Sequence, residues 1–220
     1  MQLTAERNTF SMAQSSESLP DAVELDRTSQ ATTDGALADW INSILPDAPE
    51  AGRELKRTPN DNPGRISRAY RSLLSGYLTD PKTILKITVE VPGRDHAGLV
   101  STTRIPFLSF CAHHFLPFFG TVDIVYEPGP YIIGIGKMRR LVECRARRFQ
   151  LQEFLVRQIA EDMSEFAKAK GVYVRSTARH CCVCFRGPED FTAVNTTTYS
   201  LGTLPVSTRM PEIISVLNAG

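Results

Sequence analysis

Residues 99–110 read LVSTTRIPFLSF and residues 120–128 read GTVDIVYEP, and in both segments apolar and polar side chains alternate. This period of two, together with many β-branched residues, is typical of half-buried β-strands. Four further segments have the same character: ILKITVEV (84–91), YIIGIG (131–136), VYVRSTARHCCVCF (172–185) and NTTTYSLGTL (195–204). The sequence therefore predicts a sheet formed by these segments.

Two helices are predicted between the fourth and the fifth of these strands. Apolar residues recur at helical spacing along a long helix that Gly171 terminates, and residues 137–144 predict a shorter helix before it. The apolar positions of the long helix are Leu151, Phe154, Leu155, Ile159, Met163 and Phe166. Strands, then a helical pair, then strands indicate an α+β domain whose helices pack on one face of an antiparallel sheet.

The chain before residue 79 divides into two regions. Residues 1–35 are polar and acidic without a sustained apolar period, which predicts a flexible tail. Residues 36–78 predict a helical region, with one helix closed by Pro46, a second ending at Gly76, and turns rich in proline and asparagine between them. Residues 79–220 form the main domain, which ends in a predicted helical turn or two at EIISVL (212–217).

Composition limits the classes of protein to which the chain can belong. Of its 220 residues, 42% are hydrophobic and 22% are charged, which predicts a soluble protein with a real core. The net charge of +1 provides no general field for nucleic acid or an anionic membrane, so neither is expected as a partner. No long apolar run and no signal-peptide pattern is found, which predicts a cytoplasmic location. The five cysteines are odd in number and clustered, which favours metal binding or a reactive thiol over disulfide bonds.

The segment Cys111-Ala112-His113-His114 is a candidate metal site. Its cysteine and its second histidine are three positions apart, and from a turn both side chains can reach one Zn²⁺ ion. Alone, the segment is equally compatible with a buried cysteine beside two ordinary histidines. A second cluster is needed to favour the metal site.

That second cluster is RHCCVCFR, at residues 179–186. It lies on a predicted strand, where alternate residues point the same way and share one face. The residues on that face are His180, Cys182, Cys184 and Arg186.

A catalytic zinc site keeps three protein ligands and leaves one position for water. Cys111, His114 and Cys182 would supply the three ligands, with Cys184 as the alternative to Cys182. His113 and His180 would then remain as free imidazoles close to the metal, suited to proton transfer near neutral pH.

A run of basic residues follows the glycine-rich end of the fourth strand. It can form a local anion site, with guanidinium and ammonium groups matched to phosphate oxygens, or it can be a solvated helix face. Its members are Lys137, Arg139, Arg140, Arg145, Arg147 and Arg148. Gln152 and Glu153 open the long helix, where a carboxylate is also explained by simple helix capping.

Four motifs, taken in order, resemble the GTP cyclohydrolase I family. They are C-x-H-H at 111–114, G-x-G-K-x-x-R at 134–140, Q-x-Q-E at 150–153 and H-x-C-x-x-x-R-G at 180–187. The resemblance runs from about Leu55 to Leu204. It implies a tunnelling fold (T-fold), in which antiparallel strands are backed by helices. It also implies a ring-shaped homo-oligomer, a decamer, with active sites at subunit interfaces.

The same resemblance implies a zinc-dependent hydrolase that uses no organic cofactor. Such an enzyme opens the imidazole ring of GTP at C8 and forms 7,8-dihydroneopterin triphosphate plus formate. By motif position, the zinc ligands are Cys111, His114 and Cys182, and the acid and base are His113 and His180. Glu153, helped by Gln152, is similar to the residue that anchors the guanine edge. The residues that resemble the triphosphate clamp are Lys137, Arg140 and Arg186.

Two positions depart from the family pattern. Ala112 replaces a usual glutamate and so removes a carboxylate near the metal. Gly136 replaces a serine that is thought to assist closure of the new ring. The first alternative is therefore a family member that only hydrolyses the purine ring of GTP, or of a C8-oxidised guanine nucleotide. A T-fold nitrile reductase and an inert binding module are the remaining alternatives.

Overall fold

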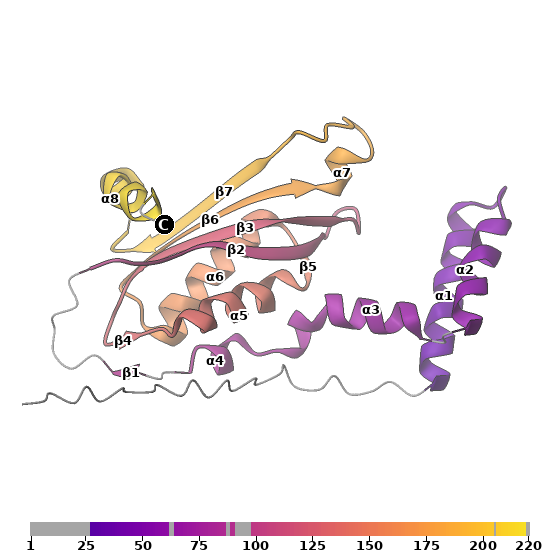
Figure 1. Ribbon diagram of the computed structural model, residues 1–220, viewed down its shortest axis with the longest axis horizontal. Helices are drawn as coiled ribbons and strands as arrows, with labels where there is room; N and C mark the ends of the chain where they lie inside the picture. The colour runs from indigo at the N-terminus through magenta and orange to yellow at the C-terminus, as the bar shows by residue number, and fades with distance from the viewer. Residues whose placement is uncertain (1–26, 62–63, 87–88, 91–97, 205, 219–220) are drawn as a thin grey trace, which may run out of the picture. The chain divides into compact units, whose positions relative to one another are not determined.

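The largest element of the computed structural model is a five-stranded sheet (Figure 1). The structure describes residues 27–61, 64–86, 89–90, 98–204 and 206–218. The strand order is β5-β2-β3-β6-β7, in which short β5 runs parallel to β2 and every other neighbouring pair is antiparallel. The strands are β2 Val100–Cys111, β3 Pro117–Glu127, β5 Phe149–Gln150, β6 Gly171–His180 and β7 Asn195–Gly202. The predicted antiparallel sheet is confirmed.

One end of this sheet brings together the segments that carry the cysteine and histidine motifs. β2 finishes there at Cys111, and β3 begins there at Pro117. Phe118 lies opposite His180, the last residue of β6, and Asn195 of β7 pairs close by. We call this the His180 end of the sheet.

The main core lies between the sheet and two helices, α5 (Ile135–Ala146) and α6 (Gln152–Ala167), which cover one of its faces (Figure 1). Both helices were predicted and both are confirmed, but α6 ends at Ala167, where Lys168 takes a left-handed conformation, and not at Gly171 as expected. Completely buried side chains from all parts of this layer meet there, among them Phe118, Ile124, Leu141, Leu155 and Ile159. The structure is therefore an α+β protein.

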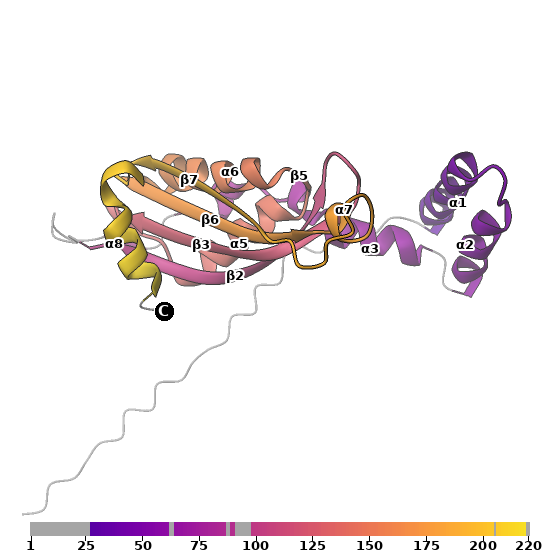
Figure 2. The same ribbon diagram turned by 90° about the horizontal axis from the view of Figure 1, so that it is seen from above.

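Helix α8 (Val206–Asn218) packs on the opposite face of the sheet, at the end away from His180 (Figure 2). Val125 and Tyr173 of the sheet meet Ile213 and Leu217 of this helix in a second, smaller core. The predicted helical turn at residues 212–217 is therefore part of a longer helix.

Two predicted strands give way early to helices or turns. Of residues 131–136, only β4 (Tyr131–Ile132) is a strand, because α5 begins at Ile135. Of residues 84–91, Ile84 ends α4 (Pro81–Ile84), and Val89–Glu90 forms β1, which pairs with β4. Residues 87, 88 and 91 lie outside the described residues.

The predicted strand over residues 172–185 is wrong beyond His180. The four residues Cys181–Cys184 form the short helix α7 instead. β3 begins at Pro117 and pairs with β6 only as far as Phe118 opposite His180, so a β6 continued beyond Cys181 would have no partner in β3. A helical turn satisfies the backbone internally, as in the hydrogen bond from the N–H of Phe185 to the carbonyl of Cys181 at 3.0 Å.

The chain forms two compact units, which divide between Gly64 and Arg65. In the first, α1 (Arg27–Ile44) and α2 (Glu50–Asp61) pack together. Residues 27–35 of the predicted tail lie in α1, and α2 occupies much of the region predicted as turns. The rest of the predicted tail lies outside the described residues.

The second unit begins with α3 (Arg65–Leu73) and the short 3-10 helix η1 (Ser75–Leu78), which match the second predicted helix. In the part of the chain that the structure describes, no helix combines the length and the apolar character needed to cross a membrane.

Candidate metal centre and active site

The motif Cys111-Ala112-His113-His114 forms a tight turn after β2. The N–H of Phe115 donates to the carbonyl of Cys111 at 2.9 Å, and the N–H of Cys111 donates to the carbonyl of Leu116 at 2.8 Å. The N–H of Ala112 donates to the carbonyl of Gln150 at 3.0 Å, which ties the turn to β5. His113 and His114 are both exposed, and their rings stand 6.0 Å apart and nearly perpendicular.

Three ligand atoms converge beside this turn. The potential ligand atoms of Cys111, His114 and Cys182 all lie within 4.8 Å of one another. Cys111 Sγ and His114 Nδ1 are 3.8 Å apart. Bond lengths of about 2.3 Å and 2.0 Å at tetrahedral Zn²⁺ place sulfur and nitrogen about 3.5 Å apart, so this pair fits the ion.

The chemistry of the two thiols also fits a cation. Burial and the neighbouring Cys111 thiol raise the pKa of the Cys182 thiol. Two thiolates in contact repel each other unless a cation lies between them, which is why metal binding and thiol deprotonation are coupled. Cys184, which was the alternative ligand, is buried and does not belong to the three-residue group.

His180 is held from two sides. The ring of Phe118 stacks on it at 4.5 Å with an interplanar angle of 5°. Nε2 of His180 lies 2.9 Å from Oε1 of Gln152, whose own Nε2 donates to the carbonyls of Ser176 and Asn195, each at 3.0 Å. Because the amide nitrogen of Gln152 is used by two carbonyls, its oxygen accepts and His180 Nε2 carries the proton. Burial lowers the pKa of His180, and the charge of Glu153 opposes this effect.

These contacts separate the roles of the two residues that open α6. Gln152 is only 3% exposed, and its amide is occupied by His180 and the sheet. Glu153 is exposed at the first turn of the helix, next to His180. The exposed carboxylate of Glu153 can therefore meet a ligand, whereas the amide of Gln152 is already hydrogen-bonded.

The predicted phosphate clamp is not assembled within one chain. Arg186 follows α7 at the His180 end, where its positive charge opposes, without reversing, the rise in the pKa of Cys182. Lys137 and Arg140 lie in the first half of α5, and the Lys137 ammonium donates to the carbonyl of Lys86. Met138 Sδ accepts from Thr102 Oγ1 at 3.1 Å. Thr102 precedes Cys111 by nine residues on β2, which is about 25 to 30 Å along an extended strand.

Three further arginines of the basic run have structural partners. Arg145 forms a two-pronged ion pair with Asp162 of α6, at 2.6 Å and 2.5 Å. Arg147 pairs with Glu143, and Arg148 donates to the carbonyls of Cys144 and Gly76. Arg147 also donates to the carbonyl of Ser72. These contacts give the three arginines a structural role, so the anion site that the sequence left open as one alternative is not needed to explain them.

Some residues of the site gave no signal in the sequence. Phe118 reads as an ordinary strand residue, and only the register of β3 against β6 shows that it supports His180. Phe115, Tyr70 and Phe149 form ring contacts beside the ligand turn, although they come from distant segments. No periodicity or motif predicts such contacts.

An antiparallel sheet backed by two helices, with a Cys-His-Cys cluster where its strands end, defines an α+β protein with a candidate metal site of the three-ligand, catalytic type. The family model described as GTP cyclohydrolase I matches residues 41–215. The chain belongs to the GTP cyclohydrolase I family.

Individual relatives agree with this assignment. GTP cyclohydrolase 1 of Fusobacterium nucleatum is 38% identical over 165 residues, which cover 74% of this chain and 87% of that protein. GTP cyclohydrolase 1 of Campylobacter lari is 40% identical over 158 residues, or 71% of this chain and 82% of the relative. That of Wolinella succinogenes is 40% identical over 152 residues, or 69% and 80%. The solved apo form of the archaeosine synthase QueF-Like covers 50% of this chain and 100% of its own at a TM-score of 0.40 and 17% identity, which is a weak likeness.

Proposed function

We propose that this chain opens the imidazole ring of GTP at C8 and forms 7,8-dihydroneopterin triphosphate and formate. Family membership supports this reaction, and the observation that carries it is the Cys-His-Cys cluster beside His113 and His180. Similar relatives bear the name GTP cyclohydrolase 1 over most of the chain's length.

Cys111, His114 and Cys182 would hold one Zn²⁺ ion through two sulfurs and one nitrogen. When bound, the ion supplies a Lewis acid that activates water near neutral pH. The turn at residues 111–116, which joins β2 to β3, and helix α7, which follows β6, bring the ligands together, and so the site depends on the folded sheet.

His180 would deliver a proton to N7 of the purine while C8 is attacked. Its Nε2 proton is committed to Gln152, so Nδ1 is the nitrogen that exchanges a proton with the substrate. Gln152 and Phe118 fix the plane of the ring. His113 is exposed beside the metal ligands, where it would handle the later proton transfers.

Glu153 would bind the guanine edge, because a carboxylate accepts from both the N1 and the N2 donors. Lys137, Arg140 and Arg186 would bind the triphosphate. Since Lys137 and Arg140 lie far from the His180 end of their own chain, we propose that a neighbouring copy supplies them.

A closed ring of copies in the tunnelling fold, a decamer, would meet this requirement. β2 and β7 are the long outer strands of the sheet, and the outer side of β2 is paired only at Phe110 and Cys111 among the described residues. Free strand edges are open to pairing with another chain. Edge-to-edge assembly would bring the clamp of one copy towards the metal end of another.

Mixing two inactive variants tests this shared site. Lys137→Ala and Cys182→Ser should each abolish turnover, but co-expressed subunits should recover about a quarter of the wild-type activity, because random neighbours then combine an intact clamp with an intact metal end. Formate release per subunit is the measurement. A mixture that stays as inactive as its components would show that each chain uses its own clamp.

Ring opening without closure is the second candidate function, and Gly136 is the observation that favours it. Gly136 lies in the first turn of α5, and a Cβ added there meets nothing within 4 Å. A serine is therefore sterically permitted, and the glycine withholds a hydroxyl at this position. A related purine oxidised at C8 would be an alternative substrate for such an enzyme.

Mass analysis of the product of GTP separates the two functions. We expect formate and pterin to form one for one with GTP consumed, since the metal ligands, histidines and guanine carboxylate are all present. An opened pyrimidine product that Gly136→Ser converts to pterin would favour the second candidate. Efficient opening of a C8-oxidised nucleotide with little turnover of GTP would identify the alternative substrate.

A further inference from the structure

Phe115, the residue that follows the ligand His114, has a backbone conformation that is unfavourable for its type. Its φ of +58° lies in the left-handed region, which bulky L-residues rarely adopt. The ligand turn requires this conformation, because the N–H of Phe115 bonds back to the carbonyl of Cys111 while Leu116 accepts from the N–H of Cys111.

Among the described residues, three aromatic rings contact the Phe115 side chain, and we call them the aromatic cage. Tyr70 of α3 stacks on it at 5.8 Å and 15°, and Phe149 of β5 lies at 5.2 Å and 31°. Phe110 of β2 is the third, at 6.0 Å. Phe115 is nevertheless 42% exposed, so ring contacts rather than complete burial hold it in place.

We propose that Phe115 is a positioning residue for the metal site. Its contacts with the aromatic cage offset the cost of the left-handed backbone and keep the turn closed. The closed turn holds Cys111 Sγ and His114 Nδ1 3.8 Å apart, which is close to the separation that a tetrahedral ion needs. Tyr70, which stacks on Phe115 and precedes Cys111 by 41 residues in the chain, thereby supports metal binding from α3.

This inference rests on the metal site of the proposed function but not on its substrate. Zinc affinity of the full-length chain, measured by competition with a chelator, is therefore the primary readout. The visible spectrum of Co²⁺ in the same site is the second, since it reports whether two sulfurs and one nitrogen surround the ion tetrahedrally.

Two substitutions of Phe115 separate the backbone from the ring. Phe115→Ala loses the ring contacts and keeps the left-handed penalty, and it should bind zinc about 10- to 100-fold more weakly, as residues that orient metal ligands do. Phe115→Gly also loses the contacts but adopts positive φ without penalty. It should therefore bind zinc at least about five times more tightly than the alanine variant does. Phe115→Tyr should match the wild type.

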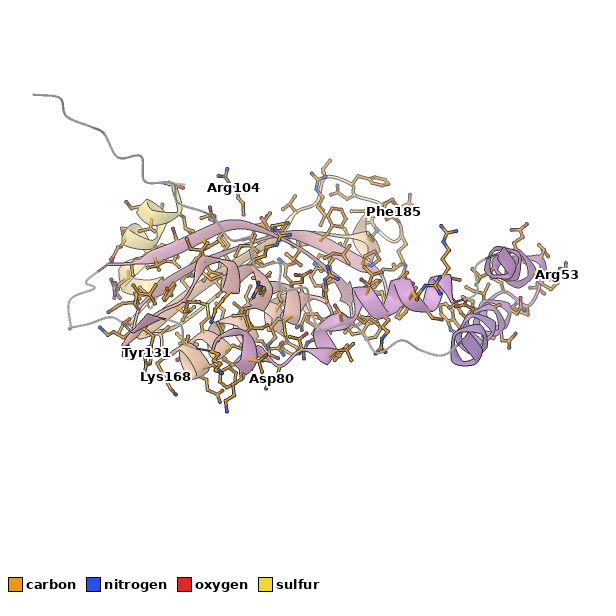
Figure 3. All side chains as sticks on the ribbon, turned by 60° about the horizontal axis from the view of Figure 1, so that its bottom comes forward. Arg53, Asp80, Arg104, Tyr131, Lys168 and Phe185 are labelled. Carbon is orange, nitrogen blue, oxygen red and sulfur yellow. The ribbon has the colours of Figure 1, made fainter. Side chains whose placement is uncertain are left out.

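Tyr70→Ala should weaken zinc binding about tenfold and alter the Co²⁺ spectrum, whereas Tyr70→Phe should restore both. Lys168→Gly is the matched control for Phe115→Gly, because Lys168 also has a positive φ of 56° but lies at the end of α6. Figure 3 shows Lys168 at the other end of this unit from Phe185, which follows α7. The control should leave zinc affinity unchanged.

Three results would overturn the inference. Equal zinc affinity in the wild type and Phe115→Ala, with only a lower melting temperature, would reduce the aromatic cage to packing. Weaker binding by the glycine than by the alanine variant would refute the backbone argument. Failure of the wild type to bind zinc at all would refute the proposed metal site, and with it this inference. The first two results, in contrast, would refute this inference and leave the metal site standing.

Discussion

Cys182→Ser should empty the metal site and lower kcat/KM for GTP by at least about 10³-fold, because removing a ligand removes several kcal/mol of transition-state stabilisation by the metal. Serine is close in size to cysteine but is a poor zinc ligand at neutral pH. The substitution should leave the backbone conformation of α7 unchanged, so the sheet should remain folded. Metal content per subunit and the far-ultraviolet circular dichroism of the same sample are the measurements.

Cys184→Ser is the matched control for this change. Cys184 lies two residues further along α7 and outside the three-residue ligand group. The variant should retain one zinc per subunit, although burying a hydroxyl in place of the buried thiol should lower its stability. Loss of zinc in Cys184→Ser with retention in Cys182→Ser would reverse the assignment of the third ligand.

Glu153→Ala should lower kcat/KM for GTP by about 10³-fold, because a site that hydrogen-bonds substrate N–H groups loses both bonds to its carboxylate. The preference for GTP over inosine triphosphate, which lacks the 2-amino group, should collapse at the same time. Affinity for free triphosphate should stay within a few-fold of the wild type. The ratio of kcat/KM for the two nucleotides is the decisive quantity.

Glu161→Ala is the control for Glu153→Ala. Glu161 lies on the same helix and is paired with Arg157 at 2.7 Å. Its replacement should leave the nucleotide preference unchanged. If Glu153→Ala weakens the binding of GTP and of free triphosphate equally, the carboxylate is only a helix cap.

The sequence predicts the architecture well where periodicity is strong. The alternating segments at 99–110 and 120–128 became β2 and β3, and the apolar stripe after Leu151 became α6. Short or mixed segments were predicted less well. Residues 133–136 were predicted as part of a strand, but α5 begins at Ile135, and its residues Met138 and Leu141 are buried in the core.

The motifs grouped Cys111, His114 and Cys182, and these three side chains lie together in the structure, but the local backbone around Cys182 was predicted wrongly. His180 and Cys182 were expected to share a strand face. In the structure, the strand stops at His180, and a helical turn brings Cys182 back towards Cys111. Local spacing cannot reveal where β6 loses its partner, because that depends on where β3 begins.

The position of the clamp was beyond local sequence reasoning as well. Lys137 and Arg186 both belong to motifs, but the direction of α5 along the sheet places them at opposite ends. Likewise, Arg145 reads as one of six bases until the packing of α5 on α6 pairs it with Asp162. Such contacts connect residues that only the tertiary fold brings together.

The separation of Lys137 from the His180 end has a consequence for kinetics. If a working site needs parts of two chains, turnover per chain depends on protein concentration and falls once dilution takes the subunits below their dissociation constant. Assays started from dilute stock should then show a lag that shortens as the concentration rises. A comparison of specific activities is meaningful only at a stated subunit concentration.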